Sequence, residues 1–306
     1  EDKITSREMI SKIRLLANNS HGSAVKLCVR HLRNQIPLAT HAKDAPNTQE
    51  NLTHFGFESI REDEKATKVH KVFEDVAQSY DLMNDVMSVG IHRLWKDAFM
   101  EELGPTPGTK LLDMAGGTGD IAFRFLKYLA NVQNPENKES HLTIGDINQH
   151  MLDVGKERAE KLGLTKIPNC TTDWVCVDAE NLPFDANTFT AYTISFGIRN
   201  CTRIDKVLSE AHRVLVPGGR FLCLEFSQLS NETLQKIYDK YSFEVIPPMG
   251  QILAGQWQHY QYLVESIRRF PQKDHFANMI RTAGFTHVTY RDLTLGISCI
   301  HSGFKL

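Results

Sequence analysis

The segment Lys110-Leu-Leu-Asp-Met-Ala-Gly-Gly-Thr-Gly-Asp120 predicts the centre of the fold. Its two leucines lead to Asp113, and the glycine-rich turn that follows runs into apolar residues at helical spacing from Ile121 to Leu129. A strand, a tight turn and a helix in this order form the opening unit of a doubly wound α/β sheet. Small ligands bind outside the carboxyl ends of the strands in such sheets, so we expect a ligand site at this turn.

Two classes of ligand fit a turn of this kind. Residues Gly117 to Ala122 match the dinucleotide pattern G-x-G-x-x-G/A. However, the carboxylate of Asp120 would repel a pyrophosphate at the start of the helix. S-adenosylmethionine has no phosphate and carries a sulfonium and an ammonium, which suit acids at Asp113 and Asp120. The turn therefore favours a methyltransferase over a dehydrogenase, although an acid is also common in any first helical turn.

The composition narrows the class of protein. The 306 residues are 41% hydrophobic and 24% charged with a formal net charge of −2, which allows a sizeable core and argues against a dedicated nucleic-acid binder. There is no run of about twenty apolar residues, so we expect no membrane-spanning helix. The six cysteines form no C-x-x-C pair. We therefore expect reduced thiols, no disulfide framework and no metal site.

The first quarter of the chain predicts a tail and then a helical cover. We expect residues 1–50 to be a disordered or presequence-like tail and residues 51–306 to be the methyltransferase domain. The basic, acid-free segment Ser23–Arg33 resembles part of an organelle presequence, and a short surface helix is the alternative. Apolar spacing predicts a helix from Lys65 to Tyr80, and the segment Tyr80–Lys96 is interpreted as a lid that also packs on the sheet.

Further strands and helices alternate after the turn. We predict strands at 142–146, 174–179, 190–197 and 220–226, helices at 151–162, 201–215 and 276–283, and a closing strand pair at 287–293 and 297–304. Asp146 and Asp178 end two of these strands, where they can accept hydrogen bonds from ribose hydroxyls and from an adenine amino group. Residues 228–270 interrupt the alternation and are interpreted as an insertion that covers the substrate. The class is α/β with a mostly parallel sheet.

Several motifs together resemble the ubiquinone/menaquinone biosynthesis C-methyltransferase family. The resemblance extends from about His54 to Leu306. The motifs are Asn84–Ser88, His92–Lys96, Leu112–Asp120, Ser195-Phe-Gly-Ile-Arg-Asn200, Glu225-Phe-Ser227, Tyr262–Pro271 and Gly296–Gly303. One position departs from the family pattern, because Gln256 stands where an aspartate is usual before an aromatic residue.

The resemblance implies the fold and the reaction. The expected fold is that of class I S-adenosylmethionine-dependent methyltransferases, a Rossmann-like sheet of seven strands, with N-terminal helices and a helical insertion after strand five. The implied reaction is C-methylation of 2-methoxy-6-polyprenyl-1,4-benzoquinol in ubiquinone biosynthesis, with S-adenosylmethionine as methyl donor. The alternatives are methylation of demethylmenaquinol and a scaffold role in a quinone-biosynthesis complex.

The resemblance also implies a location and partners. We expect the mitochondrial matrix, peripheral contact with the inner membrane and membership of a multi-protein complex. A homodimer is a further expectation, and no nucleic acid is expected as a partner.

The candidate cofactor residues surround the glycine-rich turn. The pattern of the turn and the strand ends suggests Asp113, Gly117, Gly119 and Asp146. The strand ends also suggest Asp178. The resemblance implies Asp146 and Asp178 too, and it adds Thr118, Ala179 and Ser195.

Two residues are candidates for catalysis. Arg199 would stabilise a substrate phenolate, because a guanidinium with a pKa above about 12 is a poor base; the alternative is a salt bridge at a helix start. His92 is a candidate proton acceptor, and the alternative is a structural hydrogen bond.

Six residues are candidates for substrate binding: Tyr80, Asn84, Phe196, Asn200, Ile252 and Leu253. Tyr80 and Phe196 would face a sulfonium, with core packing as the alternative. Asn200 would cap or orient its turn. The apolar run from Val245 to Leu253 would line the polyprenyl tail, and a dimer interface or ordinary core are the alternatives.

Overall fold

The structure is a computed structural model, and its described residues all lie in the unit Glu50–Leu306. They are residues 52–76, 84–85, 88, 90–229, 231–248, 251 and 257–306. The predictions for residues 1–50 and for Tyr80, Ile252, Leu253 and Gln256 lie outside the described residues.

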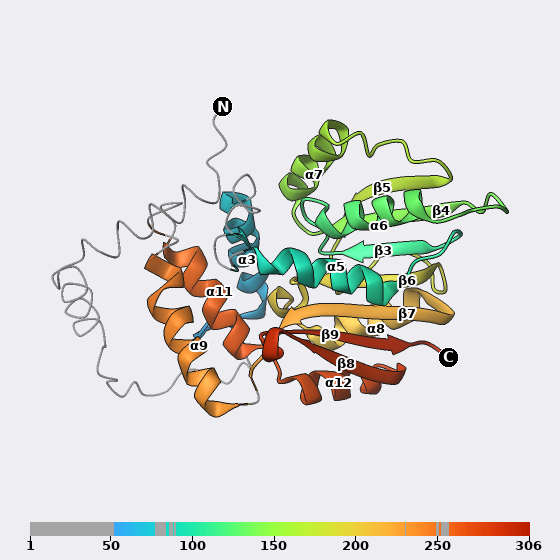
Figure 1. Cartoon of the computed structure of the whole chain (residues 1–306). Helices are drawn as coiled ribbons and strands as arrows, with labels where there is room; N and C mark the ends of the chain where they lie inside the picture. The colour runs from blue at the N-terminus through green and yellow to red at the C-terminus, as the bar shows by residue number, and fades with distance from the viewer. Residues whose placement is uncertain are drawn as a thin grey trace, which may run out of the picture. The chain divides into compact units, whose positions relative to one another are not determined.

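A seven-stranded sheet forms the centre of this unit, in the order β5-β4-β3-β6-β7-β9-β8 (Figure 1). The strands are β3 (Lys110–Met114), β4 (Ser140–Asp146), β5 (Cys170–Cys176), β6 (Phe189–Ser195), β7 (Leu215–Phe226), β8 (Thr286–Leu293) and β9 (Ser298–Phe304). All pairs from β5 to β7 are parallel, whereas β9 pairs antiparallel with both β7 and β8. The predicted fold class, a mostly parallel sheet of seven strands, is therefore confirmed.

Helices flank the sheet and gather at one end of it. They are α3 (Glu62–Val76), α5 (Ile91–Leu103), α6 (Asp120–Asn131), α7 (Gln149–Lys161), α8 (Ile204–Val214), α9 (Glu232–Glu244), α11 (Trp257–Arg269) and α12 (Lys273–Thr282), with short 3-10 turns η1 (Ile198–Asn200) and η2 (Thr294–Gly296). Figure 1 shows α3, α9 and α11 beyond the carboxyl ends of the parallel strands. In the part of the chain that the structure describes, none of the helices combines the length and the hydropathy of a membrane-spanning segment.

Several elements differ from the sequence prediction. The strand predicted at 174–179 is β5, which spans Cys170–Cys176, so Asp178 follows the strand rather than ending it. Strand β7 begins at Leu215 rather than at 220, because Leu215 pairs with Phe189 across a register shift. Helix α8 begins at Ile204 rather than at 201, because Glu180 binds the amides of Thr202 and Arg203. A hairpin that the sequence analysis did not predict is formed by β1 (Leu52–Phe55) and β2 (Glu58–Arg61). Its strands have four residues each, too few to show a clear alternation.

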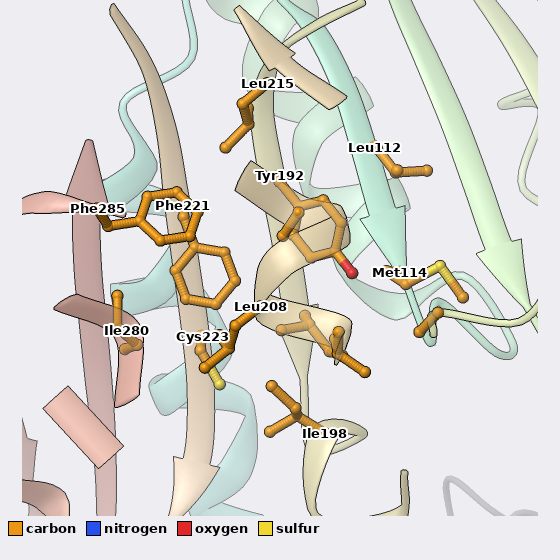
Figure 2. Close-up of a cluster of buried hydrophobic side chains, with 14 of the residues drawn as sticks. Leu112, Met114, Tyr192, Ile198, Leu208, Leu215, Phe221, Cys223, Ile280 and Phe285 are labelled. Carbon is orange, nitrogen blue, oxygen red and sulfur yellow. The ribbon is translucent and has the colours of Figure 1, made fainter. Parts of the chain in front are cut away.

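The core is divided between the two faces of the sheet. Successive side chains of a strand point to opposite faces, so Leu111 packs in one buried cluster and Leu112 in the other. Figure 2 shows the cluster that contains Leu112, in which Tyr192 packs with Phe221 at 5.7 Å between ring centroids. Because both faces are filled, a ligand of this sheet must bind at its ends.

Candidate functional site

The glycine-rich turn after β3 adopts backbone angles that favour glycine. Gly117 and Gly119 have φ values of 50° and 86°. A Cβ on Gly119 would lie 2.7 Å from the ring of Phe123 and 2.9 Å from that of Trp174. The turn therefore needs glycine at position 119 both for its backbone and for its packing.

Two carboxylates lie under this turn at the ends of β3 and β4. Asp113 is 1% exposed; its Oδ1 accepts a hydrogen bond from Thr193 at 2.8 Å, and its Oδ2 has no hydrogen-bond partner. Burial raises the pKa of Asp113 to about 7, and the charges of Asp120 and Asp146 add to the rise. The Asp146 oxygens accept the amides of Gly117 and Asn148 at 2.9 and 2.8 Å.

Burial also raises the pKa of Asp146, to about 6, in spite of these two amides. Each carboxylate oxygen has two lone pairs, so both oxygens of Asp146 keep capacity to accept a ligand hydroxyl. The turn thus presents acceptors and partial negative charge.

A third carboxylate, Asp120, begins α6 and is held by two cations. Lys96 Nζ lies 2.5 Å from its Oδ2, and Arg124 binds its Oδ1. Burial would raise the pKa of Asp120, but Lys96 and Arg124 outweigh burial and hold it well below its usual range. The ion pair of Lys96 with Asp120 therefore links α5 to the start of α6. The sequence analysis assigned no role to Lys96.

The remaining cofactor candidates sit around the same end of the sheet. The hydroxyl of Thr118 accepts a hydrogen bond from Arg158 at 2.7 Å, so its side chain is turned toward α7. Exposed Asp178 receives the amide of Glu180 at 2.9 Å, and Ala179 beside it is buried. Ser195 ends β6, and its buried Oγ has no hydrogen-bond partner. A buried hydroxyl without a partner in the chain requires a specific explanation, such as a bound water or ligand.

A largely apolar cavity of about 820 Å³ adjoins this end of the sheet. Its wall comes from α3, α5, α9, α11 and the turns η1 and η2, which far-apart segments of the chain supply. Aromatic side chains dominate, namely Phe73, Trp95, Phe196, Phe226, Tyr238, Tyr241, Tyr260 and Tyr262. A cavity of this size and polarity fits a small organic ligand with an apolar body.

Arg199 brings a charge to this apolar wall, and Glu225 holds it there. Arg199 Nη1 donates to both oxygens of Glu225 at 3.0 Å and to the carbonyl of Phe196 at 2.6 Å. The carboxylate also accepts the amides of Arg199 and Phe226, at 3.3 and 3.0 Å. Arg199 Nε is buried without a hydrogen-bond partner. The structure shows the salt bridge that was the alternative for Arg199. Arg199 also lines the cavity, and its action on a substrate phenolate stays a prediction.

Sequence reasoning gave no role to Glu225. A signal for it was present, because Glu225 ends an apolar strand as Asp113 and Asp146 do.

His92, on α5, also lines the cavity. It is 6% exposed, and its Nδ1 lies 2.7 Å from Ser88 Oγ. Burial lowers the pKa of His92 to about 4, and nearby Lys96 adds to the effect. The imidazole is therefore neutral at pH 7 and can accept a proton, but it is a weak base in this environment.

Three substrate candidates also line the cavity: Asn84, Phe196 and Asn200. Asn200 Oδ1 accepts a hydrogen bond from Tyr262 at 3.0 Å. Phe196 has a φ of 55° and packs on Phe226 at 4.7 Å. The structure therefore brings these residues to one wall with Arg199 and His92. Among the described residues, no three His, Cys, Asp or Glu side chains are grouped to hold a metal ion.

Comparison with known proteins gives a family match over most of the chain. The model of the ubiE/COQ5 methyltransferase family matches residues 61–305. The chain is 67% identical over 260 residues to "2-methoxy-6-polyprenyl-1,4-benzoquinol methylase, mitochondrial" of Drosophila melanogaster, which covers 84% of this chain and 86% of that protein. The protein of the same name from Homo sapiens is 52% identical over 280 residues, covering 83% and 84% of the two chains.

Solved structures agree on the fold. A SAM-dependent methyltransferase of Thermotoga maritima superposes with a TM-score of 0.52 at 17% identity, covering 78% of this chain and 100% of that one. Because that identity is low, this likeness concerns the fold alone.

Proposed function

Because this chain belongs to the ubiE/COQ5 methyltransferase family, we propose that it methylates a ring carbon of 2-methoxy-6-polyprenyl-1,4-benzoquinol with S-adenosylmethionine as donor. The observation that carries the proposal is the position of Arg199, a buried cation in the wall of an aromatic cavity at the carboxyl ends of β6 and β7. We take residues 51–306 as the methyltransferase domain and residues 228–270 as the cover of its substrate end.

The residues around the turn fit S-adenosylmethionine. Asp113 Oδ2 and Ser195 Oγ are buried acceptors without partners, and Asp146 keeps lone pairs for ribose hydroxyls. The carboxyl groups of Asp113 and Asp146 suit a ligand with a sulfonium and an ammonium, whereas Lys96 and Arg124 already compensate the charge of Asp120. Bound there, the donor supplies an electrophilic methyl group. Asp146, Asp178, Ala179 and Thr118 would hold its nucleoside end, and Asp113, Gly117 and Gly119 would contact the remainder.

Arg199 would act on the substrate hydroxyl. A quinol carbon becomes nucleophilic when a ring hydroxyl loses its proton, because the phenolate places charge on the ortho and para carbons. Arg199 Nε has a buried hydrogen with no acceptor, and a phenolate oxygen would supply one. A donor already fixed in place by Glu225 stabilises the developing charge without reorganising.

His92 is our candidate for the acceptor of that proton. It lines the cavity and is neutral, because burial lowers its pKa to about 4. A water between the hydroxyl and the imidazole would relay the proton. Asn84, Asn200, Phe196 and, outside the described residues, Tyr80 would hold the ring.

The location and partners follow from the same proposal. The names of the Drosophila and human relatives include "mitochondrial", and we propose the matrix face of the inner membrane, with peripheral contact, for this chain. Membership of a quinone-biosynthesis complex and a homodimer are part of the proposal. Fractionation of mitochondria, alkaline extraction and sedimentation of the native assembly test these points.

Transfer of a labelled methyl group to a short-tailed benzoquinol tests the reaction. The assay is run with and without a quinone reductant, with demethylmenaquinol as a competing substrate. Label on the benzoquinol only under reducing conditions is the expected result. A higher kcat/KM for demethylmenaquinol than for the benzoquinol would show that demethylmenaquinol is the preferred substrate. Cofactor binding without transfer to either ring would favour a scaffold.

Variants test the residues. Arg199→Ala should lower kcat at least 100-fold with unchanged affinity for S-adenosylmethionine, by analogy with loss of an oxyanion donor. Arg203→Ala is the matched control, because Arg203 lies four residues on, is 52% exposed and pairs with Glu180 instead. Equal activity of the two variants would refute the role of Arg199. Asp146→Ala should instead weaken binding of the donor.

A further inference from the structure

The described wall of the cavity reaches the surface at the turn η2. Leu295 of this turn lines the cavity and is 77% exposed. Every other apolar residue of the described wall is buried or half-buried, and Ile246 after α9 and Tyr260 of α11 are 6% and 1% exposed. Within the described residues, the cavity is thus closed among α9 and α11 and open beside Leu295.

The backbone holds Leu295 in this exposed position at a cost. Thr294, Leu295 and Gly296 follow one another with φ values of 48°, 60° and 96°. A β-branched residue and a leucine rarely adopt this left-handed region, and glycine or asparagine would connect β8 to β9 with less strain. Strain of this kind persists where the surroundings enforce it, and it gathers at ligand sites.

Fixed contacts on both sides of Leu295 enforce the turn. Trp95 Nε1 donates to Thr294 Oγ1 at 2.8 Å, and the Ile297 carbonyl accepts the Ser227 amide at 2.9 Å. Trp95 and Ile297 line the cavity as well. The exposed leucine is therefore part of a rigid rim.

The size of the cavity requires an exit for a long substrate. At about 820 Å³ it falls within the range of roughly 300–1,000 Å³ that is typical for drug-sized ligands. A ring with a few isoprene units fits such a space, but the remainder of a polyprenyl tail does not. The rest of the tail must therefore leave through an opening in the wall. Outside the cavity its apolar surface would be exposed to water unless an apolar side chain at the opening covered it.

We propose that Leu295 is the lip over which the polyprenyl tail leaves the cavity, and that it binds the isoprene units just outside. This inference rests on the proposed function, since it concerns the tail of that substrate. The lip makes the enzyme prefer long tails over short ones, because only a long tail reaches it. The proposal predicts that kcat/KM increases with the length of the tail, and that this increase depends on the side chain of Leu295.

The test is a series of quinols with one, two, three and more isoprene units, assayed with the full chain and with Leu295→Ser. The variant should lose about tenfold in kcat/KM for the longest tails, because burying a leucine contributes roughly that much, and it should keep the wild-type value for the shortest. Leu295→Met should retain the preference. Leu162→Ser is the control, because Leu162 is 52% exposed at the end of α7 and is not part of the cavity wall.

Two results would overturn the inference: an equal loss at every tail length, or no loss at any. Oxidised quinones of the same tail lengths separate it from the proposed function. They are not methylated, and their binding is followed by quenching of tryptophan fluorescence, to which Trp95 at the rim contributes. Weaker binding of long-tailed quinones to Leu295→Ser would support the lip even if wild-type protein methylated neither quinol.

Discussion

Replacement of Glu225 by alanine tests whether the ion pair with Arg199 holds the site together. The Glu225 side chain is 1% exposed and that of Arg199 is 5% exposed. Without the carboxylate, Arg199 Nη1 keeps only the carbonyl of Phe196, and the amides of Arg199 and Phe226 lose their acceptor. Breaking a buried pair from one side leaves a charge without compensation, so we expect a loss of about 3–5 kcal/mol in the free energy of unfolding.

The assay is denaturant unfolding followed by circular dichroism, with the midpoint and the slope fitted separately. A changed midpoint at constant slope reports stability, whereas a changed slope reports a different denatured or native state. Glu225→Gln keeps the shape of the side chain and should fall between wild type and Glu225→Ala.

The matched control is Asp63→Ala. Asp63 also pairs with an arginine, Arg61, but the two side chains are 64% and 54% exposed, so we expect no change in midpoint. If Glu225→Ala unfolded at the same denaturant concentration as Asp63→Ala, the buried pair would not be what positions Arg199.

Three further predictions concern the turn and the cavity wall. Burial raises the pKa of Asp113 to about 7, above its unfolded value of about 3.9, so the folded chain holds this proton to higher pH than the unfolded chain. Stability should therefore fall as pH rises from about 4 to 7, and Asp113→Asn should lose this part of the dependence; parallel stability profiles for the two proteins would contradict it. Because burial lowers the pKa of His92 to about 4, its NMR signals should not titrate between pH 5.5 and 8, and a midpoint near 6.5 would contradict its buried position. Gly119→Ala should lower both the unfolding midpoint and donor binding more than Gly163→Ala, which has a φ of 68° but nothing within 4 Å of an added Cβ; equal effects would mean that only the dihedral angle matters.

The parts of the fold that were predictable carry their signal in short stretches of sequence. Around Asp113 an apolar run typical of a strand, a glycine-rich turn and apolar residues at helical spacing follow one another. The comparisons confirm the methyltransferase family that this stretch indicated. The closing pair of strands was also predicted. The early start of β7 was not, because Leu215 enters the sheet by pairing with Phe189, and that pairing is not visible in a local pattern.

The site was predictable where acids end strands. Asp113 and Asp146 lie under the same turn, as their positions after neighbouring strands suggest. Two features depended on tertiary structure. The low pKa of His92 arises from its burial in the cavity wall, which distant segments of the chain form together. The ion pair of Glu225 with Arg199 joins residues 26 positions apart. Neither could follow from residue type alone.

The place of β9 in the sheet has a consequence for how the protein is made. β9 is the last strand in chain order, yet it lies between β7 and β8 and bonds to both. A chain that emerges from the ribosome, or is threaded through a membrane, amino end first can assemble β3 to β7 early. It then presents the open edge of β7, a ready template for pairing with another chain, until β9 arrives. Newly made chains should therefore depend on a chaperone at this stage. Pairing of β9 with β7 covers the exposed edge and ends that dependence.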